Sequence, residues 1–148
     1  MRKNLLKLIL FLIFMVSYPL SGFATTTTDN NEWEKLIKAI IQVESQGNPN
    51  AKSKDGSCVG ILQIKKILVD ECNRIQKLKK NKERFAYSDR YNIEKSKKMF
   101  DIIQKYYNKT HNIEIAIRLW NGGCNWRKRI KATQPYYEKV MREFNKLK

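Results

Sequence analysis

Residues 40–63 decide the predicted fold and site, and they read I-I-Q-V-E-S-Q-G-N-P-N-A-K-S-K-D-G-S-C-V-G-I-L-Q. Trp33, Ile37 and Ile40 recur at steps of three and four residues. On a helix with 3.6 residues per turn these side chains form one apolar stripe, and Glu44 takes the next position on it. The pattern predicts a helix over residues 32–45 that directs a carboxylate toward the interior.

Glu44 is expected in the last turn of that helix. Gly47 tolerates the left-handed cap and Pro49 cannot continue the helical hydrogen bonds, so the helix ends just after the acid. An apolar environment disfavours the ionised carboxylate and raises its pKa, and the negative end of the helix dipole acts in the same direction. Such a group can donate a proton near neutral pH. Position alone also allows a solvated glutamate, or one paired with a nearby lysine.

The same stretch resembles the catalytic motif of the lytic transglycosylases, lysozyme-like enzymes that cleave bacterial peptidoglycan. The family pattern runs E-S-x-x-N-P-x-x-x-S, then a glycine-containing loop, then G-L-M-Q. The matching residues occur here in the same order: Glu44, Ser45, Asn48, Pro49, Ser53, Gly56, Gly60, Leu62 and Gln63. G-I-L-Q replaces G-L-M-Q, and the loop over residues 56–60 is one residue longer, but neither difference touches the acid.

Later segments resemble the family in the expected order. Residues 87–93 are loosely similar to D-x-x-x-N-I. Trp120 and Asn121 match the aromatic residue and the asparagine of A-Y-N-A-G, with Gly122 in place of the second alanine. Trp126 and Arg127 either reach the glycan too or lie on the surface.

The last similar segment is T-x-x-Y-x-x-x-V, formed by Thr133, Tyr136 and Val140. It is similar to T-R-x-Y-V-x-x-V, whose tyrosine points at the catalytic glutamate in the family. Tyr136 is therefore the candidate for that role. A shift of one residue in the alignment would exchange it with Tyr137, which is otherwise expected in the core.

The resemblance implies a reaction with a single catalytic acid, Glu44. It would protonate the oxygen that leaves the β-1,4 bond between N-acetylmuramic acid and N-acetylglucosamine. It would then deprotonate the sugar's own C6 hydroxyl, which closes a 1,6-anhydro ring, while the 2-acetamido group stabilises the cation. The implied substrate-binding residues are Ser53, Gln63, Trp120, Asn121 and Tyr136, and no cofactor is implied.

Two other functions remain open at this point. A hydrolytic muramidase on the same fold would use water and a second carboxylate, for which Asp55, Asp70 and Glu71 are the candidates. A non-catalytic wall-binding module would keep the fold and bind peptidoglycan without cleaving it.

The N-terminus has the features of a secretory signal peptide over residues 1–24. Three basic residues and an apolar run over residues 8–16 precede Gly22-Phe23-Ala24, which offers small residues for cleavage. The run is too short for a comfortable membrane span, so we expect no stable span after cleavage; an uncleaved anchor is the alternative. The sequence thus predicts an exported protein, periplasmic or secreted, with a disordered leader over residues 25–31 and a catalytic domain over residues 32–148.

The net charge of the whole chain is +16, and loss of three basic residues with the signal peptide leaves +13. Such a charge favours anionic partners such as wall polymers. Nucleic acid is not expected, because the chain carries no nucleic-acid-binding motif and is exported. Peptidoglycan strands are the expected partner, and wall turnover, a secretion or conjugation apparatus, or attack on competitors are the settings in which such an enzyme could serve.

Three cysteines, Cys58, Cys72 and Cys124, predict one disulfide and one free thiol in an oxidising compartment, with the pairing left open. Their spacing fits no zinc pattern and His111 is the one histidine, so no metal site is predicted.

Apolar periodicity predicts further helices over residues 63–79, 92–107, 113–120 and 135–147. No segment alternates apolar and polar residues over the length of a strand. The predicted fold is all-α, and the resemblance to the lytic transglycosylases implies a single compact lysozyme-like helical domain.

Overall fold

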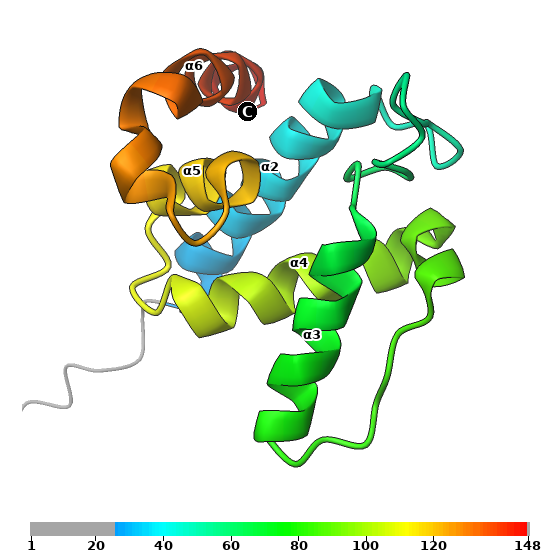
Figure 1. The fold of residues 1–148 in the computed structure, drawn as a ribbon. Helices are drawn as coiled ribbons and strands as arrows, with labels where there is room; N and C mark the ends of the chain where they lie inside the picture. Colours follow the sequence, from blue (N-terminus) through cyan, green and yellow to red (C-terminus); the bar gives the residue numbers. More distant parts are fainter. Residues whose placement is uncertain (1–25, 148) are drawn as a thin grey trace, which may run out of the picture. The chain divides into compact units, whose positions relative to one another are not determined.

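The computed structural model describes residues 26–147, which form helices joined by irregular segments (Figure 1). The α-helices there are α2 (Thr26–Ser45), α3 (Lys66–Leu78), α4 (Ile93–Tyr107), α5 (Ile113–Gly122) and α6 (Ile130–Lys146), with two 3₁₀ helices, η1 (Tyr87–Tyr91) and η2 (Trp126–Arg129). Over residues 26–147 there is no strand, and Val59 forms only isolated bridges with Lys52 and Ile64. The all-α prediction is confirmed.

The chain divides into two units, Met1–Asn31 and Glu32–Lys148. The first contributes the beginning of α2, and the packing described below is that of the second. The predicted signal peptide lies outside the described residues. No helix among the described residues is long and apolar enough to cross a membrane.

The helix α2 begins at Thr26, six residues before its predicted start at Glu32 and within the stretch predicted as a disordered leader. Residues 26–31 contain neither glycine nor proline, so nothing in them stops a helix that already exists at Glu32 from extending backward. The start of α4 agrees with the prediction to one residue. Asn92 caps it, because its side chain accepts a hydrogen bond from the backbone N–H of Lys95 at 2.9 Å.

The helix α6 begins at Ile130, five residues before the predicted start at Pro135, which lies inside the helix. Proline is favoured in the first turn because it has no N–H to leave unpaired. Here it forgoes one hydrogen bond in the second turn. The buried Arg118 ties the first turn of α6 to α5, because its Nη1 donates to the carbonyl of Ile130 at 3.2 Å and to the hydroxyl of Thr133 at 3.0 Å.

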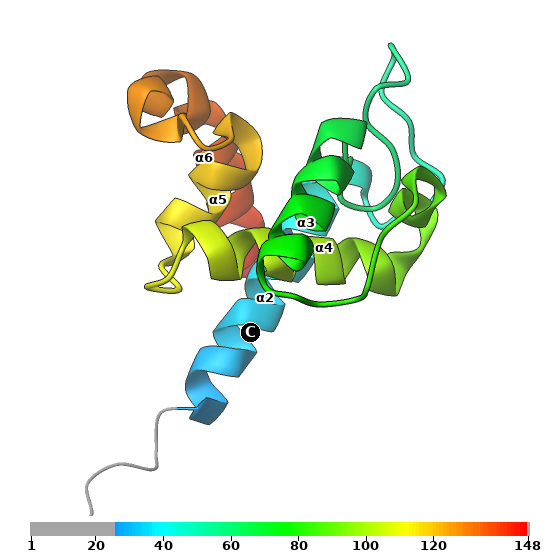
Figure 2. The same cartoon turned by 60° about the horizontal axis from the view of Figure 1, so that its bottom comes forward.

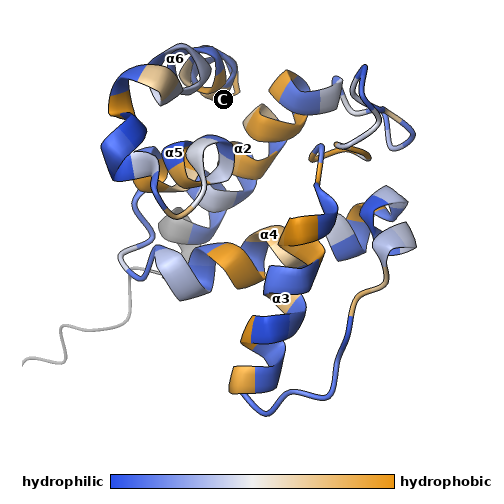
Figure 3. Cartoon of the chain, viewed as in Figure 1, coloured by the Kyte–Doolittle hydropathy of each residue, from blue (hydrophilic) through white to orange (hydrophobic). Residues whose placement is uncertain are grey.

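The hydrophobic core gathers residues from α2, α3, α4 and α5, with Val140 from α6. In Figures 1 and 2, α5 and α6 lie beside each other, and α4 runs past both α3 and α5. Figure 3 shows apolar and polar residues side by side along the helices, as in amphipathic helices, whereas the connection between α3 and α4 is mostly hydrophilic. The fold thus places both α3 and α5 next to α4.

The three cysteines are free in the structure, so the predicted disulfide is absent. Cys72 is buried in the core, Cys58 is partly buried and Cys124 is exposed. The three thiols belong to a loop, to α3 and to the segment after α5, and no disulfide joins them.

Candidate active site

Glu44 lies one residue before the end of α2, in the last turn as predicted. The side chain is half-buried, and its carboxylate oxygen Oε1 accepts a hydrogen bond of 2.6 Å from the hydroxyl of Tyr136 on α6. Burial raises the pKa of Glu44 above its ordinary value, although hydrogen bonds from Tyr136 and from the indole of Trp120 act in the opposite direction. The pKa of Tyr136 is raised as well, by burial and by the neighbouring carboxylate, so the tyrosine stays a donor. This carboxyl group is suited to holding a proton and to releasing it.

The segment after α2 is tied to the end of that helix. The hydroxyl of Ser45 donates to the carbonyl of Ile61 at 2.8 Å. The side-chain amide of Gln63 donates to the carbonyls of Gly60 at 2.9 Å and Ala51 at 3.2 Å. Both amide protons of Gln63 thus serve the loop, which leaves its oxygen Oε1 as the atom to offer to a ligand.

A glycine is required at position 60 because the backbone of Arg90 comes very close to it. A Cβ atom on it would lie 1.9 Å from the carbonyl oxygen of Arg90, and its φ is +79°. Glycine alone combines this backbone conformation with such a contact. The loop is therefore pressed against the turn that precedes α4.

The hydroxyl of Ser53 is held on two sides. It donates to a carboxylate oxygen of Asp55 and accepts a hydrogen bond from the backbone N–H of Cys58 at 3.0 Å. Hydrogen bonds from Ser53 first, and then from Ser57, lower the pKa of Asp55 to about 2. One lone pair of the Ser53 hydroxyl remains, so this residue faces a ligand as an acceptor.

The opposite wall of the site is the end of α5. The ring of Trp120 packs against Phe100, with 5.0 Å between ring centroids. A Cβ atom on Gly122 would lie 2.8 Å from the γ-methyl of Thr133 and 3.0 Å from the Cβ of Trp126. The alanine that the family motif carries at this position would therefore force α6 or η2 to move, which explains the glycine.

A groove of about 510 Å³ opens between these two walls. It is lined by Glu44, Ser53, Cys58, Gln63, Lys65, Ile67, Leu68, Trp120, Asn121, Gly122 and Gly123. Five of the six predicted site residues thus line one groove. The sixth, Tyr136, contacts Glu44 in this groove by a hydrogen bond. Among the groove-lining residues of the described chain, Glu44 is the one carboxylate.

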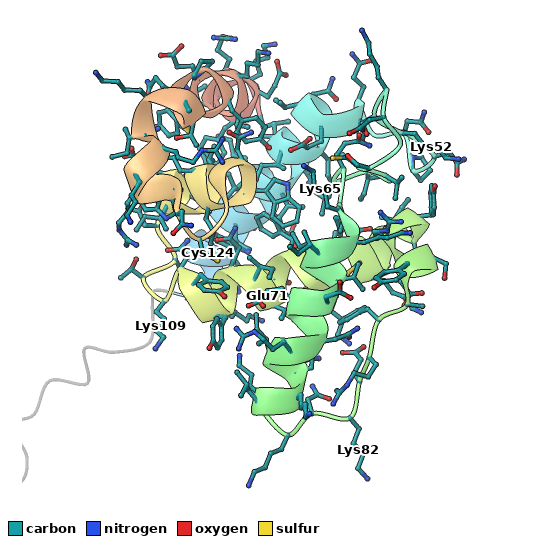
Figure 4. All side chains as sticks on the ribbon, in the orientation of Figure 1. Lys52, Lys65, Glu71, Lys82, Lys109 and Cys124 are labelled. Atoms are coloured by element: carbon teal, nitrogen blue, oxygen red, sulfur yellow. The ribbon has the colours of Figure 1, made fainter. Side chains whose placement is uncertain are left out.

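A second, more apolar hollow of about 450 Å³ continues the groove between α3, α4 and α5, and the two share Ile67, Leu68, Trp120 and Gly123. Figure 4 labels Glu71 and Cys124, which line this hollow from α3 and from the segment after α5.

The three carboxylates considered as a second catalytic group have other hydrogen-bond partners. Asp55 binds the hydroxyls of its own loop and is exposed. Asp70 accepts from the hydroxyl of Tyr87 at 2.9 Å. Glu71 pairs with Arg74 at 2.6 Å, and its pKa is lowered by that contact. None of the three lines the groove at Glu44.

Trp126 and Arg127 do not lie in the groove. Trp126 belongs to the core, and the guanidinium of Arg127 lies 4.8 Å from its ring. Sequence reasoning missed Cys58, Lys65, Ile67 and Leu68, which lie beside motif residues but carry no motif signal. Within residues 26–147 no group of three or more His, Cys, Asp or Glu residues could hold a metal ion.

The described chain is an all-helical domain with a half-buried glutamate between a loop and a helix end, as expected of a lysozyme-like fold. The model of the family described as Transglycosylase SLT domain matches residues 22–140, and the chain belongs to this family. The chain is also 52% identical over 42 residues to membrane-bound lytic murein transglycosylase E of Buchnera aphidicola subsp. Acyrthosiphon pisum (strain APS). That match covers 28% of this chain and 19% of the relative, so the chain spans about a fifth of the curated relative that it matches.

Proposed function

We propose that this chain is a peptidoglycan lytic transglycosylase. It cleaves the β-1,4 bond between N-acetylmuramic acid and N-acetylglucosamine and leaves a 1,6-anhydro end on the muramic acid. The observation that carries the proposal is the single groove carboxylate, Glu44, whose pKa is raised by burial. Membership of the transglycosylase family supports it.

In the first step the protonated Glu44 gives its proton to the leaving oxygen O4 of N-acetylglucosamine as the C1–O4 bond breaks. The carbonyl oxygen of the substrate's own 2-acetamido group stabilises the positive charge that forms at C1. The hydrogen bond from Tyr136 gains strength as Glu44 becomes an anion, so it favours the proton's departure.

In the second step the Glu44 carboxylate takes the proton of the C6 hydroxyl on the same muramic acid. The C6 oxygen then bonds to C1 and closes the anhydro ring, without water. One group thus acts first as acid and then as base, which requires a pKa near the working pH.

The groove walls bind the sugar in this proposal. Ser53 offers an acceptor lone pair to an N–H or hydroxyl group, and Gln63 offers its Oε1. Trp120 supplies an aromatic face, and Asn121 lies beside it at the end of α5. The enzyme would act outside the cytoplasm, as the N-terminal sequence predicts.

Mass spectrometry of fragments released from purified sacculi tests the proposal. We expect muropeptides with 1,6-anhydro ends from the unaltered protein. Reducing ends instead would identify a hydrolytic muramidase, and binding without release would identify a wall-binding module. Glu44→Gln keeps the side-chain shape but cannot transfer a proton, and more than a few per cent of residual activity would refute the assignment.

A further inference from the structure

A third hollow, of about 270 Å³, lies next to the groove and has a different lining. It is formed by Asp55, Gly56, Ser57, Lys65, Lys66 and Arg90. We call it the basic pocket. Lys65, which Figure 4 labels between the loop and the start of α3, lines both the groove and the basic pocket. The groove and the basic pocket are therefore neighbours on the two sides of Lys65.

The three cations of the basic pocket have no acidic partner. Neither Lys65, Lys66 nor Arg90 forms a salt bridge with another described residue. Asp55, the one acid in the lining, accepts its hydrogen bonds from Ser53 and Ser57. The pocket therefore carries an excess of positive charge.

Arg90 makes this excess unusual, because it is only 6% exposed. Its Nε donates to the carbonyl of Tyr87 at 2.8 Å, and its Nη1 donates to the carbonyls of Ile64 at 3.1 Å and Ser57 at 3.4 Å. Carbonyl oxygens orient the guanidinium but do not neutralise it, whereas buried arginines are usually paired with an anion. An anion in the pocket would complete this arrangement.

The start of α3 adds positive potential at the same place. Lys65 is its N-cap without a side-chain hydrogen bond, Lys66 follows, and the first turn contains no acidic residue. The N-terminal end of a helix has a partial positive charge, so two lysines there repel it and each other. The ammonium of Lys66 lies 5.3 Å from the ring centroid of Tyr87. This cation–π contact does not neutralise the charge of Lys66.

We infer that the basic pocket binds a free carboxylate of the peptide stem on a muramic acid bound in the groove, and that the enzyme therefore prefers peptide-bearing strands to naked glycan. This inference rests on the proposed function. Muramic acid carries its peptide on the lactyl group, and the peptide's free carboxylates are anions that a groove-bound strand can bring to a neighbouring cationic site. The lining holds three cations against one acid and no aromatic residue, which suits a carboxylate better than a sugar ring.

The test compares cleavage of peptide-bearing glycan strands with cleavage of strands from which an amidase has removed the peptides. We expect a higher kcat/KM on the peptide-bearing strands. In Lys66→Gln the ratio of the two kcat/KM values should fall about two- to fivefold, which is the contribution of one exposed charged contact. Lys66→Glu should lower this ratio further, and about 0.5 M salt should lower it in the unaltered protein by screening the charges. Activity on stripped strands should stay unchanged in both variants.

Lys82→Gln is the matched control, because it removes the same charge at an exposed position in the connection after α3 (Figure 4). An equal loss in both glutamine variants would mean general attraction to net charge and would overturn the inference. Equal cleavage of both substrates by the unaltered protein would overturn it too.

Direct binding separates this inference from the proposed function. A synthetic stem tetrapeptide titrated into the full protein should bind more weakly to Lys66→Gln, and its fully amidated form should not bind. If neither strand type is cleaved, the proposed function fails, and this titration still decides whether the pocket takes the peptide. If inorganic phosphate binds as well as the tetrapeptide does, the carboxylate assignment is overturned in favour of a phosphate-bearing anion.

Discussion

Tyr136→Phe removes one hydroxyl and, with it, the 2.6 Å hydrogen bond to Glu44. The phenyl ring remains to fill the same space, so the loss is chiefly that of a donor to the carboxylate. In the proposed mechanism Glu44 changes from a neutral acid to an anion during bond cleavage, and the tyrosine hydroxyl would stabilise the anion more than the acid. The substitution should therefore raise the barrier to proton donation more than it weakens substrate binding.

The size of the effect follows from the kind of bond. A hydrogen bond to a charged group contributes about 1.5–3 kcal/mol. Since each 1.36 kcal/mol corresponds to a factor of ten, kcat should fall roughly 10- to 150-fold if the bond is made mainly in the transition state. The pKa of Glu44 should rise further, because Tyr136 is the first of the contacts that lower it. Activity that needs the protonated acid should then persist to higher pH.

The assay is the rate of muropeptide release from sacculi between pH 4 and pH 9. Tyr137→Phe is the matched control, since it removes a hydroxyl one residue away, from a ring that lies 4.7 Å from the guanidinium of Arg118. We expect normal kcat and a normal pH profile from the control. An unchanged kcat and pH profile in Tyr136→Phe, or equal losses in both variants, would refute the assigned role of Tyr136.

Two further predictions concern stability. Burial raises the folded-state pKa of Glu44, so the stability associated with this group is fully present below its unfolded pKa and is lost as pH rises through the folded pKa. The Tm of Glu44→Gln minus the Tm of the unaltered protein should therefore be larger at pH 8 than at pH 4. An equal difference at the two pH values would contradict this. Gly60→Ala places a side chain on a left-handed residue, which costs about 1–2 kcal/mol, and overpacks it against Arg90, which costs about 1–3 kcal/mol. The free energy of unfolding, measured by chemical denaturation, should therefore fall by about 2–5 kcal/mol. Gly56→Ala, at φ +68° with nothing within 4 Å of its Cβ, should cost only the first part, and equal losses would show that the contact at Gly60 is unimportant.

Local signals set the start of α4 correctly but not the start of α2, which lies six residues before the predicted Glu32. Asn92 marks the start of α4 in the sequence and caps it in the structure. Pro135 gave the wrong start for α6, because a proline in the second turn costs one hydrogen bond that the surrounding contacts offset. Local propensity could not reveal those contacts, which involve Arg118 from another helix.

The residues expected at the site came from the motif, and the fold brings them together around Glu44. The basic pocket was not predictable in the same way. Arg90 belongs to a segment with only loose similarity to the family, and nothing in its neighbours indicates a buried guanidinium. Its burial depends on carbonyl groups of two separate segments, at Ile64 and Tyr87, which only the folded chain places around it.

The contact between Glu44 and Tyr136 spans 92 positions of the chain. A polypeptide that emerges from a ribosome or a translocation channel N-terminus first presents the glutamate long before the 17-residue α6 exists. Until α6 docks, the carboxyl group of Glu44 lacks the hydrogen bond from Tyr136. The order of synthesis therefore delays the contact between this acid and its tyrosine until α6 has been made.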